Sequence, residues 1–294
     1  MAASDDIPQF FDAASSHPPL IRALNRVGRL FVGDEPLTQT AVWAAARKGT
    51  LAECEPTPEA LAALSVLLES VAKNVRMNTV GRFSVRDDTV RIARTHLRVH
   101  RALRDTPEVQ KMRVPPPVFI IGWPRTGSTV RHQLLGRDPS SRSIPYWESF
   151  DPVPPEPGRR DRRPADLARM LSLLDRIEPR YATIHPMTAT STEECVALFM
   201  NEFRTLQFGF QYFVPEYTRW LLEEDASIAY GLYEQQLRLI QHHRPHGVRQ
   251  VLKDPTHLVH LDAVVDRFPD AKFIFTHRDP AVTLSSICSL VAYT

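Results

Sequence analysis

The segment from Val118 to Thr129 reads V-F-I-I-G-W-P-R-T-G-S-T, and it constrains the fold more than any other part of the chain. Its apolar run predicts a buried strand, Gly122 and Gly127 bracket a turn, and the residues that follow predict a helix. Glycine permits the tight turn and the close approach of backbone to a ligand that such a connection needs. Because a helix N-terminus presents unpaired N–H groups and a partial positive charge, the segment predicts an anion-binding loop.

The composition indicates a soluble globular protein. The chain has 294 residues, of which 43% are hydrophobic and 24% are charged, and this length is sufficient for a large core. A formal net charge of +2 gives no reason to expect a nucleic-acid partner. The three cysteines lack metal-binding or disulfide spacing, which favours a reducing cytoplasm. The first residues do not resemble a signal peptide, and no apolar window of about 18 residues predicts a transmembrane segment.

Two regions are expected along the chain. Residues 1–113 predict a helical N-terminal region, with helices over about 57–71 and 88–104. Residues 114–294 alternate strands with helices, which is typical of an α/β core in which helices flank a P-loop-like parallel sheet. The chain ends at Thr294 within an expected helix and without a capping residue, so we expect the core to be incomplete at its C-terminus.

Arginines recur at helical spacing in the second of these helices. We expect this stripe to be a solvated face, with peripheral contact to an anionic surface as the alternative. Its members are Arg91, Arg94, Arg98, Arg101 and Arg104.

The residues after the loop predict a connector, two strands and two helices. The proline-rich run 151–164 predicts an exposed connector, with a lid over the site as the alternative. A strand is expected over 250–252, an amphipathic helix over 256–268 and another strand over 272–276. Asp279 and Pro280 predict the cap and first turn of a last helix.

The loop departs from a nucleoside triphosphatase loop at one position. A Walker loop requires lysine after its last glycine, and this chain has Ser128 there. The cation within the loop is instead Arg125, whose guanidinium can bind two oxygens of a phosphate or sulfate. The loop therefore predicts binding of a tetrahedral anion without specifying ATP.

Two separated motifs resemble those of the sulfotransferases that use 3′-phosphoadenosine 5′-phosphosulfate (PAPS), most closely the bacterial branch with P-R-T-G-S-T. The first motif is the loop, and the resemblance implies that it holds the 5′-phosphosulfate. The second is His277-Arg278-Asp279-Pro280 followed by Ser286, and the resemblance implies that Arg278 and Ser286 hold the 3′-phosphate. The implied donor-binding residues are Arg125, Thr126, Gly127, Ser128, Thr129, Arg278 and Ser286.

The resemblance implies transfer of a sulfuryl group to the hydroxyl of a small-molecule or lipid acceptor. Such transfer needs positioning, charge neutralisation and a base, and in principle no metal. Lys253 resembles a lysine that neutralises the leaving phosphate in heparan-type relatives, a role that Arg125 could share. Glu148 is favoured as the base because several sulfotransferases place a glutamate in a similar segment. His185 is the second candidate, since its ordinary pKa of about 6.5 suits proton transfer.

Other residues have structural interpretations. The run T-S-T-E-E predicts a capping box, which would explain Glu193 and Glu194 without a catalytic role. His257 and His260 lie one turn apart with no third ligand, so no metal site is expected. The aromatic residues between Phe199 and Trp220 are expected to form core, with an apolar acceptor pocket as the alternative.

Two other functions stay open at this stage. A nucleotide kinase of P-loop type would bind magnesium–ATP despite the missing lysine. A truncated, inactive homologue would bind nucleotide without turnover.

Overall fold

The computed structural model describes residues 19–28, 37–177, 185–245 and 248–291. Expectations that fall on 178–184 or on the ends of the chain lie outside these residues. Four parallel strands form one sheet in the order β2-β3-β1-β4. The strands are β1 (Pro117–Gly122), β2 (Ser141–Arg142), β3 (Arg249–Lys253) and β4 (Lys272–Thr276). The expectation of an α/β fold with a parallel sheet flanked by helices is therefore confirmed.

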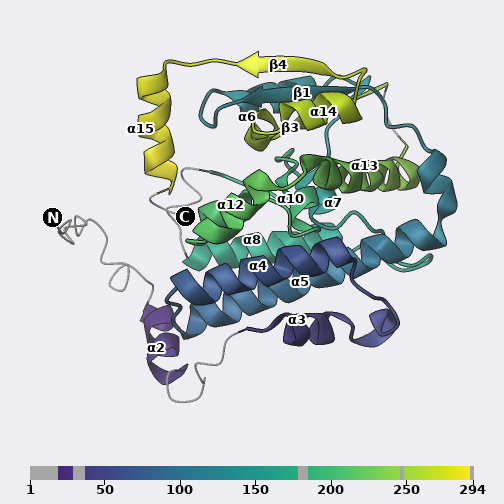
Figure 1. Ribbon diagram of the computed structural model, residues 1–294. Helices are drawn as coiled ribbons and strands as arrows, with labels where there is room; N and C mark the ends of the chain where they lie inside the picture. The colour runs from purple at the N-terminus through teal and green to yellow at the C-terminus, as the bar shows by residue number, and fades with distance from the viewer. Residues whose placement is uncertain (1–18, 29–36, 178–184, 246–247, 292–294) are drawn as a thin grey trace.

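The helices before β1 form a layer on the side of α13 away from the sheet (Figure 1). They are α2 (Pro19–Gly28), α3 (Gln39–Ala46), η1 (Gly49–Leu51), α4 (Pro58–Asn74), α5 (Thr79–Asp105) and η2 (Pro107–Lys111). The predicted cap of α4 is confirmed, because the Thr57 hydroxyl accepts from the Ala60 N–H at 3.2 Å. The second predicted helix is confirmed but starts earlier, at Thr79, since the Asn78 side chain caps it.

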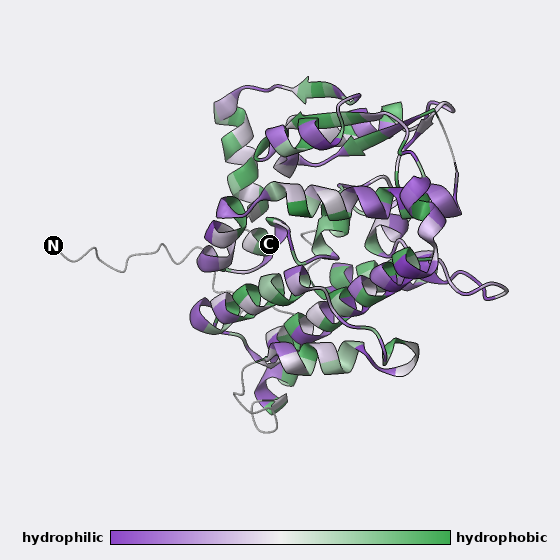
Figure 2. Cartoon of the chain, turned by 45° about the vertical axis from the view of Figure 1, so that its right-hand side comes forward, coloured by the Kyte–Doolittle hydropathy of each residue, from purple (hydrophilic) through white to green (hydrophobic). Residues whose placement is uncertain are grey.

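The remaining helices connect and cover the strands. They are α6 (Ser128–Leu135), α7 (Tyr146–Phe150), α8 (Arg163–Ile177), α10 (Val196–Met200), α11 (Gln207–Gln211), α12 (Pro215–Glu223), α13 (Ala226–His243), η3 (Pro255–Leu258), α14 (Leu261–Arg267) and α15 (Pro280–Val291). Figure 2 shows hydrophobic residues along the strands and mixed colours on the helices. The inner strand β1 is mostly buried, whereas the edge strand β4 is mostly exposed.

Residues of α10 belong to two core clusters. One joins β1 and β3 to α13 through Phe119, Leu252 and Tyr233. The largest joins α3, α4 and α5 to residues 200–221, so its members lie on both sides of the expected boundary at 113 and 114. The division into two regions stays a prediction from the sequence.

The expectation of one continuous helix over 256–268 is wrong. Asp254 Oδ1 accepts from the Thr256 N–H at 2.9 Å and the Thr256 hydroxyl at 2.7 Å, which begins a short 3₁₀ turn over η3. His260 then leaves the helical conformation, and α14 begins at Leu261. The last helix is confirmed: Asp279 Oδ1 accepts from the Ala281 N–H at 2.9 Å, and α15 begins at Pro280.

The arginine stripe on α5 is a solvated face only in part: Arg94 and Arg104 are exposed, whereas its other members are half-buried, which corrects the expectation. Arg98 forms an ion pair with Asp151 and donates to the Val153 carbonyl oxygen at 2.9 Å. Arg101 pairs with Glu156 at 3.2 Å, and the Arg91 guanidinium lies 3.9 Å from the centre of the Phe150 ring. The stripe holds the start of the proline-rich connector against α5 through these contacts.

Among the described residues, no helix is both long enough and apolar enough to span a bilayer.

Candidate functional site

The loop that is predicted to bind an anion follows β1, which lies between β3 and β4 in the sheet. Gly122 has a φ of 138°, and an added Cβ would meet the Thr276 carbonyl oxygen at 2.6 Å, so only glycine fits where β1 leaves the sheet beside β4. Gly127 has a φ of 84° and is the N-cap of α6, without any side-chain cap. The first N–H groups of α6 therefore face the loop as potential anion ligands.

Threonines fix the shape of this loop. The Thr126 hydroxyl donates to the Trp123 carbonyl oxygen at 2.7 Å, and Thr126 and Thr276 hydroxyl oxygens lie 2.6 Å apart. Arg125 holds a positive φ of 67°, which is uncommon for a residue with a side chain. The predicted loop residues thus form a braced turn at the carboxyl ends of β1 and β4, where open α/β sheets bind ligands.

The two motifs meet in space. Arg125 Nε donates to the Ser286 hydroxyl at 3.0 Å. Arg278 Nη1 donates to the backbone carbonyl oxygen of Arg125, also at 3.0 Å. The residues implied for the two ends of the donor therefore belong to one hydrogen-bonded cluster at the edge of the sheet.

Lys253 lies at the end of β3, beside β1, with only 2% of its surface exposed. Its ammonium donates to Glu194 Oε1 at 2.6 Å. The Cys195 N–H donates to the Lys253 carbonyl oxygen at 3.0 Å, which holds the segment carrying Glu194 against the strand end. A buried cation, held in an ion pair, thus lies at the carboxyl end of the strand beside β1.

His185 belongs to the same neighbourhood. Burial lowers the pKa of His185, and the charges of Glu194, Lys253 and Arg125 act on it. Its Nε2 lies 3.8 Å from Glu193 Oε2. Arg125, Lys253 and His185, three of the four predicted catalytic candidates, therefore come together.

Glu148 has a different environment. It is 2% exposed, and Arg142 donates to its Oε2 at 2.7 Å while Arg244 donates to its Oε1 at 3.4 Å. Both oxygens therefore accept from guanidinium groups. These contacts give Glu148 a structural role, and its role as a base stays a prediction.

The helix cap predicted for Glu193 and Glu194 is wrong. The helix after them, α10, begins at Val196 and has no side-chain cap. The Ser191 hydroxyl donates to Glu193 Oε1 at 3.0 Å, and burial raises the pKa of Glu193 to about 7. No local pattern links these acids to Lys253, since the ion pair joins residues far apart in the sequence.

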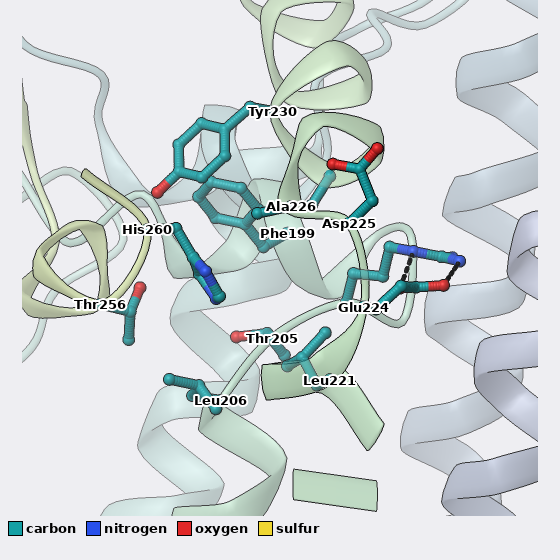
Figure 3. Close-up of a pocket in the computed structure, with 12 residues that line it drawn as sticks. Phe199, Thr205, Leu206, Leu221, Glu224, Asp225, Ala226, Tyr230, Thr256 and His260 are labelled. Atoms are coloured by element: carbon teal, nitrogen blue, oxygen red, sulfur yellow. Dashed lines mark hydrogen bonds and ion pairs between the residues drawn. The ribbon is translucent and has the colours of Figure 1, made fainter. Parts of the chain in front are cut away.

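The aromatic residues are mostly core. Phe203, Phe208 and Tyr217 are fully buried, whereas Phe210 and Phe213 are 47% and 71% exposed. Phe199 borders a small cavity with Tyr230 and His260, near the ion pair of Arg204 with Glu224 (Figure 3). Its volume of about 30 Å³ accommodates only one or two water molecules. This cavity is too small for an organic acceptor and contains no loop residue.

His96, His100 and Glu202 form a further cluster whose ligand atoms lie within 4.8 Å of one another. The Thr57 N–H donates to His96 Nε2 at 3.3 Å, so Nδ1 carries the proton, 2.9 Å from Glu202 Oε2. A metal would need the lone pair of Nδ1, and the resulting Nε2–H would then face the Thr57 N–H. The cluster is therefore suited to ion pairing between α5 and the segment after α10, and poorly suited to a metal.

Comparisons with known proteins identify the family of this chain. Residues 116–294 match the model of the sulfotransferase family. Sulfotransferase STF9 from Mycobacterium avium is similar at 30% identity and a TM-score of 0.75, over 89% of this chain and 68% of that one. Sulfotransferase STF1 from Mycobacterium tuberculosis H37Rv is similar at 27% identity and a TM-score of 0.72, over 89% and 73%. The search of curated proteins gave no match. The matched residues contain both arginine motifs, and the chain belongs to the sulfotransferase family.

Proposed function

We propose that this protein transfers a sulfuryl group from PAPS to the hydroxyl of a small-molecule or lipid acceptor in the cytoplasm. The observation that carries the proposal is the contact of the two motifs through Arg125, Ser286 and Arg278. A donor with a phosphosulfate at one end and a 3′-phosphate at the other requires two cationic sites on one surface. The exposed guanidinium of Arg278 and the braced loop with Arg125 supply them.

In this proposal the N–H groups at the start of α6, with Arg125, Thr126, Gly127, Ser128 and Thr129, bind the 5′-phosphosulfate. Arg278 and Ser286 bind the 3′-phosphate. Lys253 neutralises the charge that develops on the leaving phosphate oxygen, and Glu194 pairs with its ammonium.

The donor assignment is tested by calorimetric titration with adenosine 3′,5′-bisphosphate, the product that keeps both phosphates. Binding of this ligand, with weaker or no binding of magnesium–ATP, is the expected result. Preference for magnesium–ATP would instead support a nucleotide kinase. The acceptor is then sought by mass spectrometry of PAPS-dependent products that gain SO₃. Tight binding of the bisphosphate without any product would support an inactive homologue.

A further inference from the structure

Glu193 is a nearly buried carboxylate beside the proposed transfer site, and the mechanism above does not use it. It is 8% exposed, and the Ser191 hydroxyl donates to its Oε1. Its Oε2 is directed toward His185, with 3.8 Å between Oε2 and Nε2. One oxygen is therefore held in place by a hydroxyl, and the other lies beside an imidazole.

Neighbouring charges distinguish Glu193 from Glu194. Glu194 accepts directly from the Lys253 ammonium at 2.6 Å, so its charge is already matched. Lys253 and Glu194 act on Glu193 through longer-range electrostatic interactions. The charge of Lys253 lowers the pKa of Glu193, and the charge of Glu194 raises it. Of the two adjacent acids, Glu194 is therefore the one engaged by the ammonium, and Glu193 is the one whose Oε2 lies beside His185.

We infer that Glu193 is the general base that takes the proton of the acceptor hydroxyl, and that His185 positions this hydroxyl. An oxygen at about 2.8 Å from both Glu193 Oε2 and His185 Nε2 is compatible with their separation of 3.8 Å. The hydroxyl then donates to Glu193, accepts from the Nε2–H of neutral His185, and directs its remaining lone pair at sulfur. This inference rests on the proposed function.

The step balances in atoms and electrons. The acceptor oxygen forms a bond to sulfur while the bond between sulfur and the 5′-phosphate oxygen breaks. The electron pair of the broken bond stays on the phosphate, beside Lys253 and Arg125, and the acceptor proton stays on Glu193. The products are the sulfated acceptor and adenosine 3′,5′-bisphosphate, and no oxidant or metal takes part.

The titration of Glu193 supports this role. Burial raises its pKa to about 7, which brings the carboxylate near the pH at which a general base is most effective. The groups that face it are Ser191, His185, Glu194 and Lys253. Asp254, on the other side of Lys253, also has a pKa raised by burial to about 7, so a pH profile alone does not identify the base.

The test uses PAPS labelled with ³⁵S and water as the acceptor, and measures the rate of sulfate release between pH 5.5 and 8.5. In the unsubstituted protein, the rate is expected to rise about tenfold per pH unit below pH 7 and to level off above it. Glu193→Gln is expected to lower the plateau by about 10²- to 10⁴-fold and to abolish this rise. Glu193→Asp should restore part of the rate and the pH dependence.

Asp254→Asn is the matched control, because asparagine keeps the Oδ1 acceptor that caps η3 but does not titrate. The rise below pH 7 should persist in this variant. A rise that is lost in Asp254→Asn but kept in Glu193→Gln would overturn the inference. If the rise were lost in His185→Asn and kept in Glu193→Gln, the inference would also be overturned, because histidine would then be the base.

Binding separates this inference from the proposed function. Glu193→Gln should bind adenosine 3′,5′-bisphosphate as tightly as the unsubstituted protein, since Glu193 is not assigned to the phosphates. If neither protein binds the bisphosphate, the proposed function fails. If the unsubstituted protein binds it but gives a pH-independent rate, or no sulfate release above background, the base assignment fails.

Discussion

The guanidinium of Arg278 donates from Nη1 to the backbone carbonyl oxygen of Arg125 at 3.0 Å, although 153 positions separate the two residues. Arg125 in turn donates from Nε to the Ser286 hydroxyl at 3.0 Å. Arg125 thus links Arg278 to the Ser286 hydroxyl on α15. Because both contacts involve donor-binding candidates, substitutions in one motif should affect the ligand held by the other.

Arg278→Ala tests the assignment of Arg278 to the 3′-phosphate. The variant loses a charged hydrogen-bond donor for the 3′-phosphate, and a lost hydrogen bond to a charged group costs about 1.5 to 3 kcal/mol. We expect the Kd for adenosine 3′,5′-bisphosphate, measured by calorimetry, to rise about 10- to 100-fold. Arg278→Lys should recover only part of the affinity, since lysine lacks the planar fork of donors.

Arg104→Ala is the control for this experiment. Arg104 is an exposed arginine on α5 that pairs with the adjacent Asp105, so its removal changes the net charge equally without touching the loop. Equal affinity in Arg278→Ala and in the unsubstituted protein would refute the assignment of the 3′-phosphate site.

Much of this arrangement is predictable from the sequence, because it depends on local signals. Thr57 and Asp279 carry helix caps that the structure confirms, and the apolar runs at β1 and β4 follow directly from their patterns. The contact of the two motifs also follows, since both lie at the carboxyl ends of neighbouring parallel strands.

Long-range ion pairs could not be predicted in the same way. Lys253 pairs with Glu194, and Arg98 pairs with Asp151, yet nothing near either acid in the sequence specifies its partner. Glu193 and Glu194 fit a capping-box pattern equally well, and only the packing of the segment before α10 against β3 shows otherwise. Tertiary context therefore decided which charged residues belong to the site.

Gly122→Ala is expected to destabilise the protein at the exit of β1. A Cβ there would lie 2.6 Å from the Thr276 carbonyl oxygen, and the φ of 138° is strained for any side chain. Backbone strain and overpacking each cost about 1 to 3 kcal/mol, so we expect the free energy of unfolding in urea to fall by about 2 to 5 kcal/mol.

Gly231→Ala provides the opposite case. Gly231 lies within α13, and a Cβ there meets no atom within 4 Å. Alanine should therefore raise the free energy of unfolding by about 0.5 to 1 kcal/mol through helix propensity and a less flexible unfolded chain. If both variants had the same stability, the close approach of β1 to Thr276 would be wrong.

Glu148→Gln should be destabilising because it breaks a buried ion pair and leaves the Arg142 guanidinium without its charge partner. Loss of one partner from such a pair costs about 3 to 5 kcal/mol. A double-mutant cycle with Arg142→Met, read by urea unfolding, should give a coupling energy well above that of exposed pairs, about 1 kcal/mol or less. A loss of sulfate release in the fully folded variant would support the alternative role of Glu148 as the base.

Zinc should not stabilise the protein through the His96, His100 and Glu202 cluster. The Thr57 N–H occupies the lone pair of His96 Nε2, so Nδ1 keeps its proton and cannot bind a metal without breaking this contact. We expect the same melting temperature with and without zinc at neutral pH. A zinc-dependent rise that disappears in His100→Ala would show instead that the cluster is a metal site.

The same cluster should make stability depend on pH. Burial raises the pKa of Glu202, but its electrostatic and hydrogen-bond interactions with His96 and His100 outweigh this effect and hold it at about 2, below its ordinary 4.5. A lowered carboxyl pKa stabilises the fold above pH 4.5, and this contribution is lost as the pH falls from 4.5 toward 2. A shift of this size corresponds to about 3 kcal/mol.

The contribution of His100 to stability depends on pH in the opposite direction. Burial lowers the pKa of His100, and Glu202 more than offsets this, so the pKa is raised above 6.5. Its contribution is complete below pH 6.5 and is lost as the pH rises through the folded-state pKa. Together the two groups stabilise the fold most between about pH 4.5 and 6.5. Glu202→Gln should therefore reduce the free energy of unfolding most strongly in this window and less at pH 3 or pH 8.5. A loss of equal size at every pH would show that Glu202 contributes by packing, because an ion pair between α5 and the segment after α10 must weaken when either partner becomes neutral.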